Sequence, residues 1–349
     1  MRRLKVLLLP PQAVGGYRDG YAPDACPDPF DLERRLAAEG IELTTLDPAG
    51  RPWNPFVGRH PLLEGMDIWR ALRILLFARR YDVVLSVMEA GAAPLVLLRR
   101  LFGFRTPIAL WDLAPAERWR FRRRLQDFVL PRVQGVLALP SSQVDYIARR
   151  WSPAPPVIVV GGQIDTDFFR PMGTAPAGDY IFSIGQDVGR DFATLIAAMD
   201  GVATTLRLRT SRKLPEQAAR MAHVEVLRQR VSDPALRDLY AGSRFVVAPL
   251  TPTENANGVT TIHEAGAMGK AIIVSDNAAI RDFVIPEETC LLVPCGDVGA
   301  LRAAIRRLLA DPDLCARLGR NARHFVTERW GNAAFATRFA AAIRAVAGD

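Results

Sequence analysis

Residues 257–276 read NGVTTIHEAGAMGKAIIVSD, a glycine-bearing loop followed by a predicted short helix and a predicted β-branched strand. Gly258 lets the backbone come close to a ligand. The amides of Val259, Thr260 and Thr261 would have no intrahelical partner in the first turn, and the positive end of the helix dipole favours an anion there. The stretch therefore predicts an anion-binding loop at a helix start in an α/β fold.

Glu264 lies one helical turn after Thr260, so its carboxylate projects on the same side of the predicted helix but further in. A carboxylate there can accept hydrogen bonds from both hydroxyls of a ribose. Gly269 is expected to end the helix, and residues 271–274 to form a buried parallel strand. We interpret the stretch as an anion-plus-ribose site. The same pattern is also typical of an ordinary βα-turn with Glu264 exposed to solvent.

Residues 264–270 read EAGAMGK, and residues 294–297 read PCGD. With the glycine loop, these motifs resemble the donor-site signature of retaining GT-B glycosyltransferases of family 4, also called glycosyl transferases group 1. The resemblance covers most of residues 160–335. It implies two Rossmann-like, doubly wound parallel-sheet domains that face each other across a cleft. The chain departs from the pattern at Ala256, where the family has its first glutamate, and Glu254 is the candidate replacement.

Members of this family usually carry an Arg directly after the first glycine of the donor domain and a Lys about five residues later, and this pair neutralises the departing diphosphate. Here Gln186 stands at the Arg position and Arg190 near the Lys position. Arg212 and Lys213 follow a predicted strand over 205–208. They would either supply the missing charge from the neighbouring loop or be exposed to solvent.

Strands and helices alternate through the first half of the chain, which predicts a parallel doubly wound sheet. Strands are predicted over 4–9, 42–46, 83–87, 107–111, 136–139 and 157–160, and helices over 31–39, 67–80 and 142–150, with a further helix opening at 88–91. Within the second of these helices, Arg70, Arg73, Arg79 and Arg80 are expected to form a basic face.

Two loops at the carboxyl ends of these strands are candidate ligand sites, because open α/β sheets bind ligands at that edge. Gly15 and Gly16 follow the first strand, and in the family this loop lies near the donor phosphates; a simple tight turn is the alternative. Trp111-Asp112 occupies the place of the family's frequent His-Asp. Asp112 would act as a base or sugar-binding group, or would cap the following helix.

Residues 118–124 read RWRFRRR, the most basic segment of the chain. Such a run is usually a solvated helix face, but the interleaved Trp119 and Phe121 also suit an anionic lipid headgroup layer. No nucleic-acid partner is expected, since no recognised motif accompanies the arginines.

The composition indicates two domains, because the chain has 349 residues, 49% of them hydrophobic, and single cores stop growing near about 250–300 residues. The formal net charge is +8. Residues 1–170 hold 24 Lys and Arg against 18 Asp and Glu, which leaves 45−24=21 against 37−18=19 for the rest. The basic excess of the first half favours a polyanionic acceptor or an anionic membrane surface.

The four cysteines and four histidines form no metal-ligand spacing, and no Asp-x-Asp pair is suited to bridging a metal to a diphosphate. We therefore expect no metal and no cofactor besides the sugar nucleotide as co-substrate. The apolar run 6–9 is too short for a signal peptide, and 83–98 too broken for a membrane span. A cytoplasmic protein is expected, with peripheral contact at the inner face of the membrane as an open alternative.

These patterns and the resemblance together predict an acceptor domain over 1–170, a donor domain over 171–332 and a C-terminal helix, 333–349, that crosses back to the first domain. The expected reaction transfers a sugar from a nucleoside diphosphate sugar to a glycan, lipid-linked or small-molecule acceptor, with retention. A sugar-nucleotide epimerase and a non-catalytic sugar-nucleotide or polyanion binder are the alternatives. The candidate catalytic residues are Arg190, Asp112 and Lys213, and the candidate donor-binding residues are Gly15, Gly16, Gln186, Arg212, Asn257, Gly258, Val259, Thr260, Thr261 and Glu264.

Overall fold

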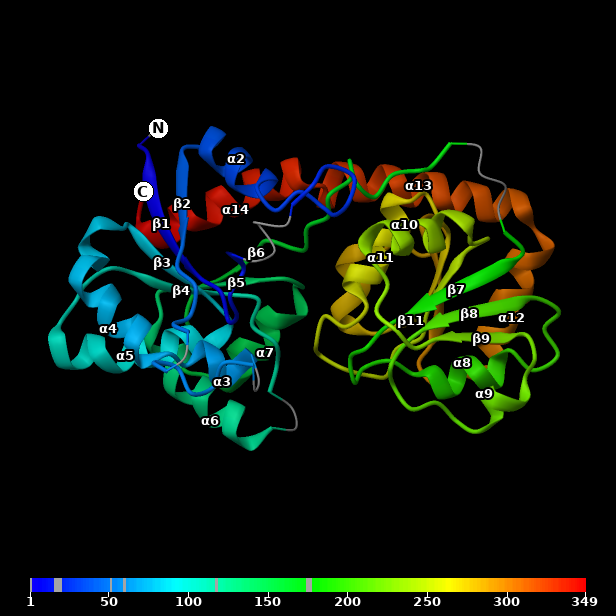
Figure 1. Cartoon of the computed structure of the whole chain (residues 1–349), viewed down its shortest axis with the longest axis horizontal. Coiled ribbons are helices and arrows are strands. Elements are labelled where there is room, and N and C mark those ends of the chain that lie inside the picture. The colour runs from blue at the N-terminus through cyan, green and yellow to red at the C-terminus, as the bar shows by residue number, and fades with distance from the viewer. Residues whose placement is uncertain (1, 16–20, 51, 59–60, 117–118, 174–177) are drawn as a thin grey trace. The chain divides into compact units, whose positions relative to one another are not determined.

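The computed structural model describes residues 2–15, 21–50, 52–58, 61–116, 119–173 and 178–349, which form two compact units (Figure 1). Unit 1 comprises Met1–Tyr21, Pro29–Gly161 and Ala333–Asp349, and unit 2 comprises Ala22–Asp28 and Gly162–Asn332. The predicted division at 170/171 thus falls a few residues inside unit 2. The last 17 residues, 333–349, belong to unit 1.

Unit 1 is built on a parallel sheet with the strand order β2-β1-β3-β4-β5-β6. Its strands are β1 (Leu4–Leu9), β2 (Ile41–Thr45), β3 (Val83–Val87), β4 (Ile108–Trp111), β5 (Gly135–Ala138) and β6 (Val157–Val159). Its helices are α2 (Asp31–Ala38), α3 (Pro61–Gly65), α4 (Ile68–Phe77), α5 (Met88–Phe102), α6 (Arg120–Val129), α7 (Ser142–Arg150) and α14 (Asn332–Ala347), with 3₁₀ turns η1 (Ala78–Arg80) and η2 (Leu130–Arg132).

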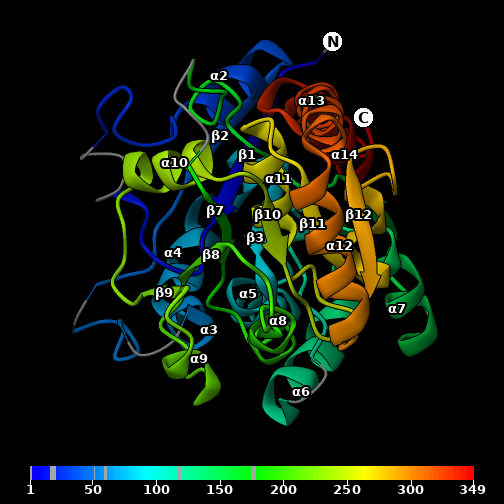
Figure 2. The same cartoon turned by 90° about the vertical axis from the view of Figure 1, so that its right-hand side faces the viewer.

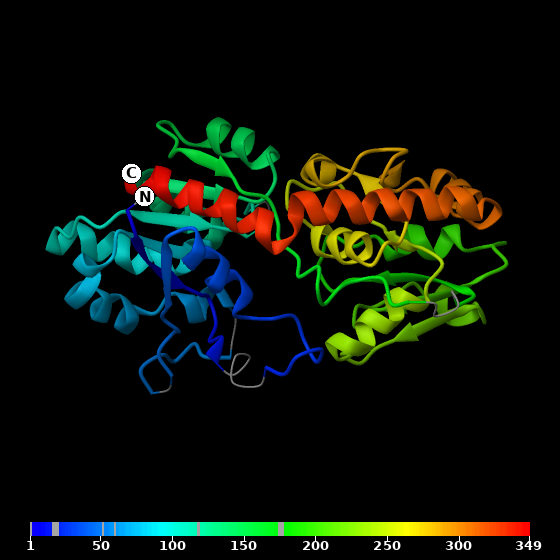
Figure 3. The same cartoon turned by 90° about the horizontal axis from the view of Figure 1, so that it is seen from above.

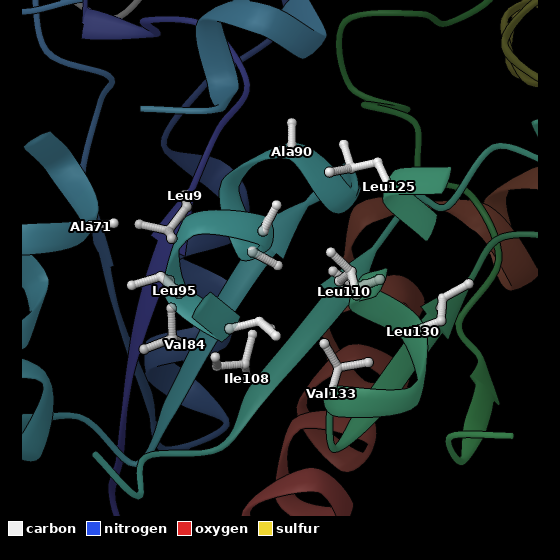
Figure 4. Packing of buried hydrophobic residues seen from close by; sticks show 14 of the residues in the cluster. Leu9, Ala71, Val84, Ala90, Leu95, Ile108, Leu110, Leu125, Leu130 and Val133 are labelled. Carbon is white, nitrogen blue, oxygen red and sulfur yellow. The ribbon is translucent and has the colours of Figure 1, made fainter. Parts of the chain in front are cut away.

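The central strands of unit 1 are apolar on both faces because helices cover both faces of the sheet. On one face, Leu9, Val84 and Ile108 pack against side chains of α4, α5 and α6 (Figure 4). On the other face, alternate strand residues such as Val6 and Leu85 pack against α2 and α14. Burial of side chains on both faces gives the unit its core.

Unit 2 has the strand order β12-β11-β10-β7-β8-β9, again with parallel pairings, and β12 lies at one edge beside β11 (Figure 2). Its strands are β7 (Tyr180–Ile184), β8 (Thr205–Arg209), β9 (Val224–Leu227), β10 (Val246–Ala248), β11 (Ile272–Asp276) and β12 (Cys290–Pro294). Its helices are α8 (Phe192–Ala198), α9 (Gln217–Arg220), α10 (Asp233–Gly242), α11 (Val259–Ala267), α12 (Val298–Ala310) and α13 (Pro312–Trp330), with η3 (Ala278–Phe283). The long α13, orange in Figure 3, packs along α11.

Counted within unit 2, the strand order is 3-2-1-4-5-6 read from β9, the arrangement of Rossmann folds. The chain direction across the sheet reverses between β7 and β10, and ligands of such sheets bind at this switch point, beyond the carboxyl ends of the strands. The predicted pair of doubly wound parallel sheets is confirmed.

The predicted basic helix over 67–80 is wrong in two respects. The α-helix ends at Phe77, and a 3₁₀ turn follows. Arg70 is buried, and its guanidinium donates to the carbonyl oxygens of Pro10 (2.8 Å), Gly65 (2.8 Å) and Leu46 (3.3 Å). Burial lowers the pKa of Arg70 to about 10, so the side chain stays charged while it ties together three loops.

Replacing Arg70 with Met should destabilise unit 1 by about 3 kcal/mol, because three buried carbonyl groups lose their hydrogen-bond donor. Urea unfolding would measure this loss. Arg73→Met on the same helix is the matched control, since Arg73 is exposed and should stay within about 0.5 kcal/mol of the unmutated protein. Equal effects at the two positions would contradict the structural role of Arg70.

Candidate functional site

The switch point of unit 2 lies where the loop after β7 meets the segment after β10. Arg190 forms an antiparallel bridge with Leu250 there. A Cβ atom on Gly185 would lie 2.4 Å from Arg190 Nε, and one on Gly189 would lie 1.9 Å from Asn257 Nδ2. Both positions therefore require glycine for the side chains of Arg190 and Asn257 to pack against the loop.

Arg190 is the central cation of this site. Its Nε donates to the Asp187 carboxylate at 2.8 Å, and its Nη2 donates to the Thr261 hydroxyl at 3.0 Å. The side chain is only 5% exposed, and Nη1 is buried without a hydrogen-bond partner among the described residues. A buried guanidinium nitrogen without an acceptor is suited to an anionic ligand.

The start of α11 lies against this guanidinium through Thr261. Gly258 precedes the helix with φ of 85°, a left-handed conformation that glycine adopts without strain, and no side chain caps the helix. The Val259 amide donates to the Ala256 carbonyl at 3.4 Å, so it is not the free donor that the sequence suggested. In the described parts of the chain, the amides of Thr260 and Thr261 have no acceptor, and they remain as anion donors.

Glu264 lies one turn into α11 and accepts a hydrogen bond of 2.7 Å from the hydroxyl of Tyr240 on α10. Burial raises the pKa of Glu264 to about 7, and the Tyr240 hydroxyl and Arg190 oppose part of that rise. Burial and the nearby Glu264 also raise the pKa of Tyr240 well above its usual value. The carboxyl group is therefore held in place and changes charge near neutral pH.

Tyr240 was not predicted as a site residue from the sequence. Its ring is fully buried against Phe182, with ring centroids 5.0 Å apart, and reads as an ordinary core residue of an amphipathic helix. The usable signal was its hydroxyl, because a buried tyrosine usually finds a hydrogen-bond partner.

The other predicted site residues of unit 2 are Gln186, in the loop after β7, and Arg212 and Lys213, in the loop after β8. Gln186 Oε1 accepts from the Ser211 amide (3.0 Å) and hydroxyl (2.6 Å). The Arg212 guanidinium donates to the Asp187 carbonyl oxygen. Lys213 is exposed and forms no hydrogen bond or ion pair with the residues that the structure describes. Arg212 is thus joined to the Arg190 loop, whereas a catalytic role for Lys213 stays a prediction.

In unit 1, amides of the loop after β1 already donate hydrogen bonds to a carboxylate of the protein. The Asp47 carboxylate accepts from the amides of Val14 (3.1 Å) and Gly15 (3.1 Å). The Gly15 amide is therefore occupied, and Gly16 lies outside the described residues.

Asp112 follows β4 directly and has a positive φ of 60°, a conformation that concentrates at functional sites. Burial raises the pKa of Asp112, Arg122 opposes this rise, and Glu89 adds to it. The next helix starts at Arg120 with Trp119 at the N-cap, so Asp112 does not cap it.

Trp111, which replaces the histidine typical of the resembling family, packs within unit 1. Its ring contacts Phe339 on α14 at a centroid distance of 4.8 Å and Phe335 at 6.1 Å. Trp111 therefore packs against the hydrophobic core at the carboxyl end of β4.

Glu89 is a second carboxylate at the same edge of the sheet, and it was not predicted as a site residue. It is fully buried just after β3, and Met88 before it has a φ of 62°. Arg122 forms a two-pronged ion pair with its carboxylate, and Gln126 Nε2 donates to it at 3.3 Å. A lone acid within the apolar run 83–98 was the available signal.

The segment 118–124 is consequently only partly a basic face. Arg122 points to Glu89, Arg118 lies outside the described residues, and Arg120, Arg123 and Arg124 are exposed. Across the described ranges, no three His, Cys, Asp or Glu side chains are grouped as metal ligands. No helix within those ranges has the length and apolar character needed to cross a bilayer.

Residues 190–311 match the family model described as glycosyl transferases group 1. Among solved structures, sucrose-phosphate synthase from Thermosynechococcus elongatus superposes with a TM-score of 0.74 at 19% identity, over 97% of each chain. Trehalose 6-phosphate synthase from Burkholderia multivorans gives 0.73 at 13% identity over 100% of this chain and 99% of the other. HepE of Anabaena, solved with UDP-glucose, gives 0.69 at 15% identity over 98% and 100%. No curated protein sequence matches this one.

The fold is that of the GT-B glycosyltransferases, with two Rossmann-like units. The matched segment starts at Arg190 and includes all of α11, so these two parts of the switch-point site lie within the segment that matches group 1 glycosyl transferases. The chain is an enzyme of the glycosyltransferase type.

The raised pKa of Glu264 predicts a pH-dependent stability of unit 2. The folded protein binds a proton that the unfolded chain releases near pH 4.5, so stability should fall as pH rises from 4.5 to about 7, by about 3 kcal/mol in total. Glu264→Gln, which keeps an acceptor for Tyr240, should remove this part of the pH dependence. Denaturant unfolding of both proteins at several pH values would measure it; parallel curves would contradict the burial of a titrating carboxyl group.

Proposed function

We propose that this enzyme transfers a sugar from a nucleoside diphosphate sugar to an acceptor held by unit 1. The observation that carries the proposal is the Arg190–Thr261 hydrogen bond of 3.0 Å. It brings a buried guanidinium, whose Nη1 has no partner among the described residues, to the amino end of α11. A diphosphate is the ligand whose charge and oxygen atoms suit both features.

Breaking the bond between the sugar and the diphosphate leaves negative charge on the departing phosphate oxygens. Arg190 Nη1 and the amides of Thr260 and Thr261 are donors fixed in place before the reaction. Such preorganised donors stabilise charge where it develops, and loss of one typically costs about 10²–10³-fold in turnover. We propose that this arrangement acts without a metal ion.

Glu264 would accept the two ribose hydroxyls of the donor. The ionised carboxylate is the stronger acceptor for both, so donor affinity should rise as pH passes through about 7, the pKa of Glu264. HepE, which was solved with UDP and with UDP-glucose, makes uracil the first base to test.

The acceptor would be a glycan, a lipid-linked sugar or a small hydroxylated molecule. Asp112 supports this role in unit 1, because it is a half-buried carboxylate at the carboxyl edge of the sheet. Asp112, whose pKa is raised by burial, is the group suited to take a proton from an acceptor hydroxyl. Retention at the anomeric carbon is proposed from the sequence resemblance alone.

The direct test is a screen of UDP-, GDP- and ADP-sugars by thermal shift, followed by an assay for free nucleoside diphosphate. A matching donor at about 100 times its dissociation constant should add about 2.7 kcal/mol to the free energy of unfolding, and the nucleotide should be released when an acceptor is present. Isomerisation of the donor without an acceptor would identify an epimerase instead. Binding without release or isomerisation would identify a non-catalytic binder.

Arg190→Gln should lower turnover by about 10²–10³-fold, because the charge facing the departing diphosphate is lost. The exposed Arg220, replaced by Gln, is the charge-matched control and should retain activity. Steady-state kinetics would be measured for both, with melting temperatures to verify folding. Unchanged turnover in a folded Arg190→Gln protein would remove Arg190 from the mechanism.

A further inference from the structure

The ends of α4 and α5 expose large apolar side chains at one edge of unit 1. Leu76 is 86% exposed, Leu101 67% and Phe102 65%. Exposed leucines scattered singly are common, but three grouped large side chains are a mark of an interaction surface.

The helix ends that carry these three residues lie together in the fold. The Thr106 hydroxyl, just after α5, donates to the Ala78 carbonyl oxygen, just after α4, at 2.9 Å. The helices α4 and α5 pack against each other. The first of them precedes β3 and the second follows it, and β4, the neighbour of β3, starts shortly after Thr106. We call this surface, at the amino-terminal edge of the sheet, the α4–α5 edge.

The charge of the α4–α5 edge has one sign. Residues 68–81 and 97–107 contain no Asp or Glu. The exposed arginines of these two stretches are Arg73, Arg79, Arg80, Arg100 and Arg105. None of these arginines has an ion pair with any residue that the structure describes, and the nearest carboxylate in sequence, Asp82, accepts from Arg2 and the Lys5 amide.

We propose that the α4–α5 edge docks on the surface of an anionic lipid bilayer. Protruding apolar tips would enter the boundary between headgroups and acyl chains, while the surrounding arginines reach lipid phosphates with their stems along the apolar layer. A second copy of the chain does not suit this surface, because two edges with five exposed arginines each would repel.

This docking surface differs from the basic segment that the sequence singled out. Trp119 and Phe121 of that segment are 40% and 44% exposed, and Arg122 is paired with Glu89. In addition, α6 follows β4 and starts near the carboxyl edge of the sheet, where Asp112 and Glu89 lie. Docking through the opposite edge leaves the carboxyl edge of the sheet, where Asp112 is half-buried, free for an acceptor.

The experiment is flotation of the full-length protein with vesicles of neutral phosphatidylcholine, and with vesicles that also contain about 30 mol % anionic phosphatidylglycerol. The unmutated protein should bind only the anionic vesicles. Leu101→Ser with Phe102→Ser should lower the partition coefficient by at least about tenfold. Arg100→Gln with Arg105→Gln should do the same, since each arginine near such a surface contributes about fivefold.

The matched controls are the corresponding pairs on α6, Trp119→Ser with Phe121→Ser and Arg123→Gln with Arg124→Gln. They should bind anionic vesicles as the unmutated protein does. The proposal is overturned if anionic vesicles are not bound, if the loss follows the α6 pairs, or if both sets have equal effects. It is also overturned if light scattering shows a dimer that the Leu101/Phe102 variant dissociates, since a second copy then covers the edge.

Discussion

The hydrogen bond between Arg190 and Thr261 is the contact on which the switch-point site of unit 2 depends. It joins the loop after β7 to the first turn of α11, two segments that the Rossmann strand order brings to the same switch point. Without it, the guanidinium and the free amides of the helix start would be separate features. Together they give a positively charged site that offers hydrogen-bond donors to an anion.

The same site contains a carboxyl group whose charge is finely balanced. Glu264 is half-buried near Arg190, and the Tyr240 hydroxyl on the neighbouring helix donates a hydrogen bond to it. Burial favours the neutral acid, while the cation and the hydroxyl favour the anion. A ligand that donates hydrogen bonds from two hydroxyls to Glu264 would further favour the anion. Ligand binding and ionisation of Glu264 would therefore support each other.

The sequence predicted the fold well where a single physical signal dominates. The apolar runs at 4–9 and 83–87 are strands with the predicted bounds, because buried parallel strands need apolar residues on both faces. Arg70 shows the limit of prediction from sequence periodicity. Its position in a periodic helix indicates a basic face, yet its side chain is buried and donates to carbonyl groups of distant loops. Asp47 on the Gly15 amide, Tyr240 on Glu264 and Arg122 on Glu89 were out of reach for the same reason, since each contact joins residues far apart in the chain.

Unit 1 is completed by the last helix of the chain. Phe335, Phe339 and Ile343 of α14 belong to its core, and Arg344 binds the carbonyl oxygens of Arg2 (3.0 Å) and Glu39 (2.8 Å). A ribosome therefore has to synthesise α14 before the amino-terminal half can close its interior. Most of unit 2 is one continuous stretch, Gly162–Asn332, which emerges complete before that helix does. During synthesis, the usual order in which the first half folds first is thus reversed: unit 2 can form while unit 1 still waits for α14.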